Sequence, residues 1–256
     1  MTHESGTLSP DGVRSMFDRI APVYDRMNRL MTAGLDRSWR RETVAAVVQP
    51  GDRVLDACCG TGDLALEAER GGGIVTGLDF SPRMLERARR KSESIVWVEG
   101  DLLALPFEPE TFDAATVGFG VRNLADLDAG LRELRRVLRP GGRLAVLEIT
   151  TPRGPFRPFF SLWLDRIVPA AGKVLPGGKA YTYLPASVRR FPDAESLSER
   201  LGEAGFTDVR VRLFGGTIVA LHTGIACGDS AAESERPKAA SSAPAAPSPR
   251  GARRRR

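Results

Sequence analysis

The stretch DACCGTGDLA, residues 56–65, decides which fold this chain adopts. An apolar run precedes it and a helical pattern follows, so a strand, a tight turn and a helix are expected in succession. Gly60 and Gly62 fit the Gly-x-Gly-x-x-Ala spacing that lets a backbone approach a bound nucleotide in an open α/β sheet. The turn alone is compatible with NAD, with another adenosine cofactor, or with a metal or redox centre at Cys58 and Cys59.

Strands and helices alternate from this turn onward. The helix expected before the fifth strand carries a leucine stripe that includes Leu138, and it is expected to stop at Pro140-Gly141-Gly142. Near the C-terminus, a helix is followed by two strands around Gly215-Gly216, which predicts a hairpin. The expected strands are 53–58, 73–79, 94–101, 112–119, 143–150, 207–214 and 217–226. This order predicts a Rossmann-like three-layer α/β/α sandwich: a mostly parallel seven-stranded sheet with an antiparallel C-terminal hairpin strand and an N-terminal helical cap.

Composition divides the chain into one folded domain and two tails. Residues 1–10 and 228–256 are expected to be disordered, the second because Ala, Ser, Pro and charged residues cannot bury a core. The folded domain is expected over 11–227. Within it, 11–48 forms the helical cap, and the proline- and aromatic-rich segment 152–190 is an insert that faces the substrate or a membrane.

The charge pattern argues against a nucleic-acid partner. The chain has a net charge of +5, but residues 228–256 hold seven basic and three acidic residues, so the body carries only +1. Three cysteines, two of them adjacent, do not make a disulfide framework. No apolar run is long enough to span a bilayer, and the N-terminus does not have the pattern of a signal peptide. A cytoplasmic protein without a metal site is therefore expected.

Acidic residues at successive strand ends select among the candidate cofactors. Asp56 ends the first strand, where it meets a cationic group; Asp79 ends the second, placed for ribose hydroxyls; and Asp101 ends the third, placed for an adenine amino group. Asp63 stands at the helix N-terminus, where a pyrophosphate would otherwise dock. Acids in these places suit a cationic adenosine ligand that has no phosphates. S-adenosylmethionine is such a ligand.

The segment LRPGGRL precedes the fifth strand, and a helix and a β-hairpin follow at the C-terminus. Together with the glycine turn and the acids, these features make residues 50–224 resemble class I methyltransferases. YDRMNRLMTAGLDRSW (24–39), FGVRN (119–123) and RVLRPGGRLAVLEIT (136–150) further resemble segments of the quinone-biosynthesis C-methyltransferases. That resemblance implies methylation of a ring carbon of demethylmenaquinol, or of the ubiquinol precursor, with S-adenosylmethionine as the methyl donor. The cofactor-binding residues expected from the acids and the resemblance together are Asp56, Gly60, Thr61, Gly62, Asp79, Asp101, Leu102 and Gly118.

The catalytic residues expected from the resemblance follow the fourth strand and lie in the cap. Arg122 would stabilise the oxyanion that develops on the quinol, Asn123 would orient the hydroxyl, and Tyr24 would close the pocket. Two of these residues have a purely structural role as the alternative. Arg122 would instead form a salt bridge with Asp126 or Asp128, and Tyr24 would be a half-buried packing residue.

The chain departs from the family pattern at five positions. Thr32 replaces the usual serine, and Asp36 replaces the usual histidine; Asp36 is expected to cap a helix, so no catalytic histidine is available there. Gly118 replaces a serine near the cofactor, so that contact either comes from the backbone or is lost. Cys58 and Cys59 replace two glycines of the turn and are read as small residues beside the cofactor.

Because the quinol implied by the resemblance carries a long isoprenoid tail, the enzyme has to reach it at a membrane surface. Aromatic and arginine residues of the insert form a candidate lid or interfacial helix, or else pack on the sheet. They are Arg153, Phe156, Arg157, Phe159, Phe160, Leu162, Trp163 and Arg166. A transient membrane contact and a homodimer are the expected associations. The alternative functions are a small-molecule N- or O-methyltransferase and, in a different class, an NAD-dependent oxidoreductase.

Overall fold

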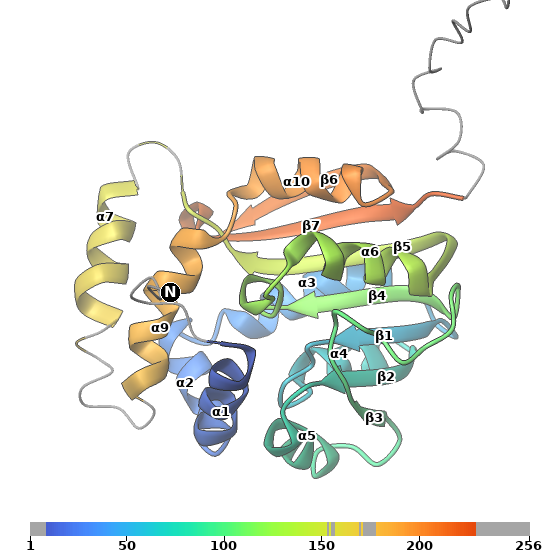
Figure 1. Ribbon diagram of the computed structural model, residues 1–256, viewed down its shortest axis with the longest axis horizontal. Coiled ribbons are helices and arrows are strands. Elements are labelled where there is room, and N and C mark those ends of the chain that lie inside the picture. The colour runs from blue at the N-terminus through green and yellow to red at the C-terminus, as the bar shows by residue number, and fades with distance from the viewer. Residues whose placement is uncertain (1–8, 153, 155–156, 169, 171–177, 229–256) are drawn as a thin grey trace, which may run out of the picture.

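The computed structural model describes residues 9–152, 154, 157–168, 170 and 178–228. Figure 1 shows a twisted sheet with helices on both faces and a group of helices beside one end of it. The helices are α1 (Pro10–Ile20), α2 (Tyr24–Met31), α3 (Asp36–Val47), α4 (Asp63–Arg70), α5 (Pro82–Arg89), η1 (Val121–Asn123), α6 (Leu127–Val137), α7 (Arg157–Leu162), η3 (Trp163–Ile167), α9 (Gly178–Arg190), α10 (Ala194–Glu203) and η4 (Gly215–Thr217). The strands are β1 (Arg53–Ala57), β2 (Ile74–Asp79), β3 (Val96–Glu99), β4 (Phe112–Gly118), β5 (Leu138–Ile149), β6 (Phe206–Phe214) and β7 (Val219–Ala226).

The sheet has the predicted architecture. Its seven strands follow the order β3-β2-β1-β4-β5-β7-β6. The pairs among β1 to β5 are parallel, and β7 runs antiparallel to both β5 and β6. The predicted sandwich with its antiparallel hairpin strand is therefore confirmed. The strand order reverses between β1 and β4, the place where sheets of this kind bind ligands.

Alternation along the strands separates two apolar layers. In β1, Leu55 and Ala57 belong to the large core cluster that includes residues of α6 and α10, whereas Val54 belongs to the cluster shared with α4. Adjacent side chains of a strand point to opposite faces, so both faces of this central strand are buried. This core fixes the loops that follow β1 and β4.

The junction of α6 and β5 corrects one expected boundary. The leucine stripe predicted a helix through Leu138 that stops at Pro140-Gly141-Gly142, but α6 ends at Val137 and Leu138 already pairs with Phe112 of β4. Proline lacks the N–H that a helix needs and disfavours helical backbone in the residue before it. The chain therefore extends before Pro140, and Leu138 is buried as the first residue of the strand.

The N-terminus of α3 corrects another expectation. Asp36 is the first residue of this helix, but Leu35 occupies the cap position and no side chain caps the helix. Asp36 is buried; it accepts a hydrogen bond from Thr32 Oγ1 (3.0 Å) and pairs with Arg40 one turn later. A buried carboxylate needs such partners, and Arg40 satisfies it better than the helix terminus does.

The helical cap is tied to the sheet by polar contacts beside the glycine turn. Thr61 Oγ1 donates to Asp25 of α2 (2.5 Å), and Ser81 Oγ donates to Asp18 of α1 (2.6 Å). Lys91 pairs with Asp25 at 2.8 Å. In Figure 1, α1, α2, α7 and α9 gather at the end of the sheet toward which β4 points. The cap thus covers the carboxyl ends of the central strands.

The insert contributes α7, η3 and α9. Phe160 stacks on Trp163 and is buried with Leu164 and Val188, so it packs inside the molecule, while Leu162 is exposed. Arg153 and Phe156 lie outside the described residues, as do the expected tails apart from their ends next to α1 and β7. Within the described parts of the chain, no helix is both long and apolar enough to cross a membrane.

Candidate active site

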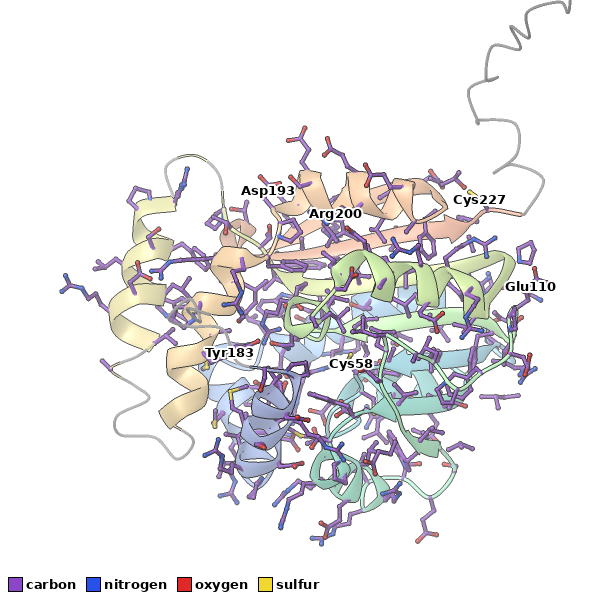
Figure 2. The ribbon with its side chains drawn as sticks, in the orientation of Figure 1. Cys58, Glu110, Tyr183, Asp193, Arg200 and Cys227 are labelled. Carbon is purple, nitrogen blue, oxygen red and sulfur yellow. The ribbon has the colours of Figure 1, made fainter. Side chains whose placement is uncertain are left out.

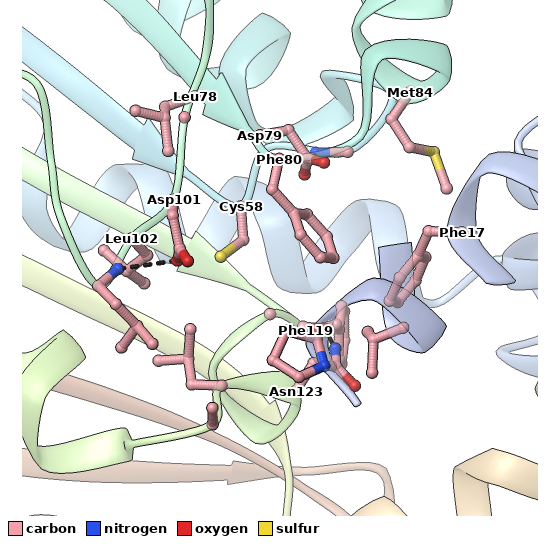
Figure 3. A pocket seen from close by; sticks show the side chains of 18 of the residues that line it. Phe17, Cys58, Leu78, Asp79, Phe80, Met84, Asp101, Leu102, Phe119 and Asn123 are labelled. Atoms are coloured by element: carbon pink, nitrogen blue, oxygen red, sulfur yellow. Dashed lines mark hydrogen bonds between the residues drawn. The ribbon is translucent and has the colours of Figure 1, made fainter. Parts of the chain in front are cut away.

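Two adjoining cavities lie at the carboxyl ends of the parallel strands. The first holds about 780 Å³ of empty space and lies against β1, β2 and the loop after β3 (Figure 3). The second, of about 720 Å³, lies between the cap and the segment after β4. Both are lined by Phe17, Tyr24, Phe119 and Asn123. Figure 2 places Cys58 and Tyr183 toward this side, with Glu110 and Cys227 at the far end of the sheet.

The turn after β1 has the backbone geometry that its glycines predict. Gly62 has φ +84°, and a Cβ there would lie 2.5 Å from Trp97, so no other residue fits without displacing that ring. The N–H of Gly60 donates to Asp79 Oδ2 (2.8 Å), which fastens the turn to the end of β2. Cys58 adopts the left-handed region (φ +54°) where the family has glycine, at a cost of about 1 kcal/mol.

Asp79 is partly committed to holding the backbone. Its second oxygen accepts from the N–H of Ser81 (2.9 Å), so both oxygens already receive a hydrogen bond. Burial nevertheless raises the pKa of Asp79 to about 6. Its carboxylate lines the first cavity, and further donors from a ligand would stabilise its charged form.

Asp56 presents an unsatisfied carboxylate oxygen. It is fully buried at the end of β1; Oδ1 accepts from Thr116 (2.9 Å), while Oδ2 has no hydrogen-bond partner among the described residues. Burial raises the pKa of Asp56 to about 7. Such an oxygen is well suited to an incoming cation, as the sequence predicts.

The end of the first cavity beside the loop after β3 is apolar and contains one carboxylate, that of Asp101. Asp101 is exposed and accepts from the N–H of Leu103 (2.9 Å), and Leu102 beside it is buried (Figure 3). Phe80 and Met84, which pack with Phe17 of α1, line the cavity on the side of the cap (Figure 3). The sequence analysis missed both, although Phe80 directly follows Asp79 at a strand end. Flat aromatic and apolar walls with a single acceptor fit an adenine.

The other two expected cofactor residues differ in what they offer. Thr61 is buried and gives its hydroxyl to Asp25 of the cap, so it contributes the backbone of the turn. At Gly118, a Cβ would lie 3.1 Å from Leu64 Cδ2. Leu64 thus takes up space that a serine would need, which leaves the cofactor contact at Gly118 to the backbone.

Asp63 repels a phosphate ligand at the helix N-terminus less strongly than the sequence suggested. Its carboxylate pairs with Lys91 Nζ at 2.6 Å, and the same ammonium binds Asp25. The charge at this helix terminus is therefore partly neutralised. Asp56 is the stronger argument against a dinucleotide, because its buried, unpartnered carboxylate oxygen disfavours a phosphate beside the glycine turn.

Arg122 lines the second cavity as part of a buried ion pair. Its guanidinium binds Glu148 of β5 (2.8 Å) and the carbonyl oxygen of Phe119, while its Nε is buried without a partner among the described residues. The salt-bridge reading was right about the kind of contact but wrong about the partners. Asp126 caps α6 and Asp128 binds Arg200.

Glu148 is a site residue that the sequence analysis missed. The signal was present: an acid inside the apolar strand sequence RLAVLEIT must be paired if both faces of the strand are covered. Burial raises the pKa of Glu148, and Arg122 opposes that rise. The two side chains therefore hold each other charged in the wall of the second cavity.

Tyr24 and Asn123 lie where the two cavities meet. Burial raises the pKa of the Tyr24 phenol, an effect that Arg122 opposes, so the side chain is a neutral hydroxyl at physiological pH. Asn123 Oδ1 is buried without a partner in the described part of the chain. Together with Arg122, these residues give the second cavity a polar corner in walls that include Met16, Met27 and Met31.

The cysteines form no reactive centre. All three are free thiols, and Cys227 lies at the far end of the sheet from the other two (Figure 2). Burial raises the pKa of Cys58 and of Cys59 well above the ordinary range, which keeps both thiols protonated. Cys58 lines the first cavity as a small side chain, which agrees with the sequence reading.

Comparison with known proteins gives consistent results. Residues 5–226 match the model of the ubiE/COQ5 methyltransferase family. A demethylmenaquinone methyltransferase from Roseiflexus castenholzii is 45% identical over 83% of this chain and 92% of its own length. The protein of the same name from Thermus thermophilus is 45% identical over 82% of this chain and 99% of its own.

Solved structures share the fold at lower identity. An S-adenosylmethionine-dependent methyltransferase from Thermotoga maritima superposes with a TM-score of 0.63 at 20% identity, covering 83% of this chain and 99% of its own. The cyclase SpnF reaches 0.63 at 21%, covering 87% and 99%. One fold thus serves different chemistry, so the reaction has to be argued from the site.

Proposed function

This chain belongs to the ubiE/COQ5 methyltransferase family, and from that premise we propose that it methylates a ring carbon of demethylmenaquinol with S-adenosylmethionine. The observation that carries the proposal is the junction of the two cavities, where the pocket lined by Asp79 and Asp101 adjoins an apolar chamber lined by Arg122. Relatives named demethylmenaquinone methyltransferase favour this substrate over the ubiquinol precursor.

The first cavity fits the cofactor. Asp56 has a buried free oxygen for a cationic group, Asp79 and the turn at Gly60 and Gly62 suit ribose hydroxyls, and Asp101 with Leu102 suits an adenine edge. S-adenosylmethionine supplies a methyl group on a sulfonium, an electrophile that needs only a correctly placed nucleophile. The protein's task is therefore to place and activate the ring carbon.

Arg122 activates the nucleophile in this proposal. A quinol carbon becomes nucleophilic once a neighbouring hydroxyl loses its proton to solvent, and a guanidinium beside that oxygen favours the phenolate. The carbon then forms its bond to the methyl group as the S–CH3 bond breaks, and the ring regains aromaticity when that carbon releases its own proton to solvent. Glu148 and Phe119 engage only Nη1 of Arg122, so its Nε, which is buried without a partner among the described residues, still has a donor to offer the substrate. Because a guanidinium does not deprotonate in proteins, it stabilises the oxyanion and does not act as the base.

Asn123 and Tyr24 position the ring. The free Oδ1 of Asn123 is an acceptor that can hold the quinol hydroxyl. Tyr24 stands at the passage between the cavities, so its ring limits how far the substrate enters toward the cofactor. Apolar walls around this corner exclude water from the transfer.

We also propose that the cap brings the enzyme to the cytoplasmic face of the membrane. Leu30 and Leu35 are exposed around the turn between α2 and α3, beside exposed arginines that include Arg29 and Arg37. The same helix α2 lines the quinol cavity through Met27. Co-flotation with anionic vesicles that is lost in a Leu30→Glu, Leu35→Glu double variant tests this contact. We further propose that the chain forms a homodimer, which sedimentation velocity would detect as a species of twice the mass of the chain.

The substrate assignment is tested by complementation. The chain would be expressed in a bacterium that accumulates demethylmenaquinone because its own C-methyltransferase is deleted, and the extracted quinones would be identified by mass spectrometry. Wild-type chain should restore menaquinone, Arg122→Gln should not, and Arg132→Gln, an exposed arginine on α6, should behave as wild type. Persistent demethylmenaquinone with wild-type chain, present at normal levels and folded, would contradict the proposal.

A further inference from the structure

A third, smaller cavity extends from the cofactor pocket toward α3. It contains about 320 Å³ of empty space and shares Tyr24, Cys58, Gly60 and Gly118 with the first cavity. Its other polar groups come from opposite sides: Asp56 at the end of β1 and Arg40 from α3. The adenine end of the cofactor is assigned to the Asp101 side, so this recess lies toward the other end of the ligand.

Arg40 is an unusual residue to find here. It is only 9% exposed, and its Nη1 pairs with Asp36, its sole hydrogen-bond partner among the described residues. A guanidinium has five N–H donors, so one contact leaves most of them for another acceptor. A buried arginine that lines a cavity with donors to spare is a binding group for an anion, in particular a carboxylate.

Asp36 fixes the direction in which Arg40 points. The carboxylate lies one helical turn before Arg40 and is itself held by the Thr32 hydroxyl at 3.0 Å. This chain of contacts restrains the long arginine side chain and keeps its charge stable in a buried place. The guanidinium is therefore pre-organised, which reduces the entropy lost when a ligand binds.

The recess offers opposite charges to a zwitterion. Asp56 presents its unpartnered oxygen and Arg40 its spare donors, and the two are near enough for the arginine to stabilise the charged carboxylate. An α-amino acid group carries one ammonium and one carboxylate on the same carbon. The methionine part of S-adenosylmethionine is such a group, and its carboxylate is the part of the cofactor not yet assigned to any residue.

We propose that Arg40 binds the carboxylate of the cofactor's methionine group, while Asp56 receives its ammonium. Arg40 also lines the quinol cavity, so its position links the two binding sites. The inference rests on the cofactor and not on the quinol, so it stands or falls separately from the substrate assignment.

Isothermal titration with three ligands tests the proposal. S-adenosylhomocysteine has the full amino acid group, its decarboxylated analogue keeps the ammonium alone, and 5′-methylthioadenosine has neither. In wild type, removing the carboxylate should weaken binding by about 10- to 100-fold, the usual value of a charge-assisted contact. In Arg40→Gln, S-adenosylhomocysteine should bind no better than its decarboxylated analogue, and binding of 5′-methylthioadenosine should equal that of wild type.

Matched variants separate binding from folding. Arg41→Gln removes an exposed arginine from the same helix and should leave all three affinities unchanged. An Asp36→Asn, Arg40→Gln double variant removes both buried charges together and should keep the binding pattern of Arg40→Gln. If Arg40→Gln still prefers S-adenosylhomocysteine over the decarboxylated analogue by the wild-type factor, or loses all three ligands equally, the proposal is wrong.

Discussion

At the residue scale, Asp56 and Asp79 differ in whether a carboxylate oxygen is left free for a ligand, which the sequence did not indicate. Asp56 and Asp79 both end strands, and the strand pattern alone predicts a ligand at each. In the structure Asp79 holds the turn through Gly60 and Ser81, whereas Asp56 keeps a free oxygen. Which oxygen remains free depends on backbone N–H directions in the turn, and these are set only when the turn folds.

The charge of Asp56 should lower the stability of the fold while it strengthens cofactor binding. Burial raises its pKa from 3.8 to about 7, so the folded state binds this proton more tightly than the unfolded state does. Stability from this group is present at low pH and is lost as pH rises from about 4 to about 7. Asp56→Asn should therefore stabilise the protein, with a gain about 2 kcal/mol larger at pH 8 than at pH 5.5.

Urea unfolding of wild type and Asp56→Asn at the two pH values measures this difference. The variant should also bind S-adenosylhomocysteine far more weakly, because the ammonium loses its partner. A stability difference between variant and wild type that is the same at both pH values would show that Asp56 does not change its charge in this range.

Glu148 should act as a positioning residue for Arg122. Glu148→Gln leaves a buried guanidinium without its counter-charge, which should cost about 3 kcal/mol of stability. The same change strengthens the positive potential at the quinol hydroxyl. The acidic limb of the pH profile of kcat/KM should therefore move to lower pH by about one unit.

Thermal unfolding and the pH profile together decide the role of Glu148. A merely structural residue would lower stability and activity with the acidic limb unmoved, and that outcome would contradict the assignment. Asp128→Asn, which breaks a partly exposed pair with Arg200, is the control and should leave the profile unchanged.

At the element scale, the cap is fastened to the sheet at the rim of the cofactor cavity. Burial alone would raise the pKa of Asp25, but Lys91 and Thr61 bring it below its ordinary value, so this carboxylate is charged and fully engaged. Asp18 and Ser81 make a second fastening. Because α1 and α2 line both cavities, these contacts couple cofactor binding to the order of the cap.

Weakening the Asp25 contact should therefore weaken cofactor binding without unfolding the sheet. Asp25→Asn should lower the affinity for S-adenosylhomocysteine by about 3- to 10-fold, since it weakens charge-assisted contacts at one rim. Hydrogen exchange of α1 and α2 should rise while that of β1 and β4 does not. Glu99→Gln, which breaks the exposed pair with Arg14, is the matched control; equal affinities for Asp25→Asn and wild type would contradict the coupling.

The elements themselves were largely predictable. Short apolar runs and the breaks between them located all seven strands, and the signal is strongest in central strands such as β1 and β4, which are buried on both faces. Two local expectations were wrong. The leucine stripe predicted a helix through Leu138, but Pro140 disfavours helical backbone before it and the helix ends at Val137. Asp36 was expected to cap α3, but it forms an ion pair with Arg40 instead. In both cases the deciding neighbour is close in the sequence, a proline two residues later and an arginine one helical turn later, and its effect outweighed the pattern used for the prediction.

At the scale of the whole molecule, the function comes from the way the cap and the sheet enclose two joined cavities. The fold is shared with proteins near 20% identity, one of them a cyclase, so the sheet alone does not specify the reaction. The sequence identified Arg122 and Asn123 through their resemblance to a family, but the partner Glu148 and the recess at Arg40 come from segments that meet only in three dimensions. Pairings between distant strands and helices are what the sequence could not supply.

The central claim is that the methyl group goes to a ring carbon of a reduced demethylmenaquinone. The direct test is to incubate purified protein with S-adenosylmethionine carrying a trideuterated methyl group and a chemically reduced, short-tailed demethylmenaquinone, and to locate the label by mass spectrometry and NMR. The account predicts a trideuteromethyl group on the quinone ring carbon and none on oxygen, with the product lost in Arg122→Gln. Label on an oxygen, or transfer to a ubiquinol precursor but not to demethylmenaquinol, would contradict it.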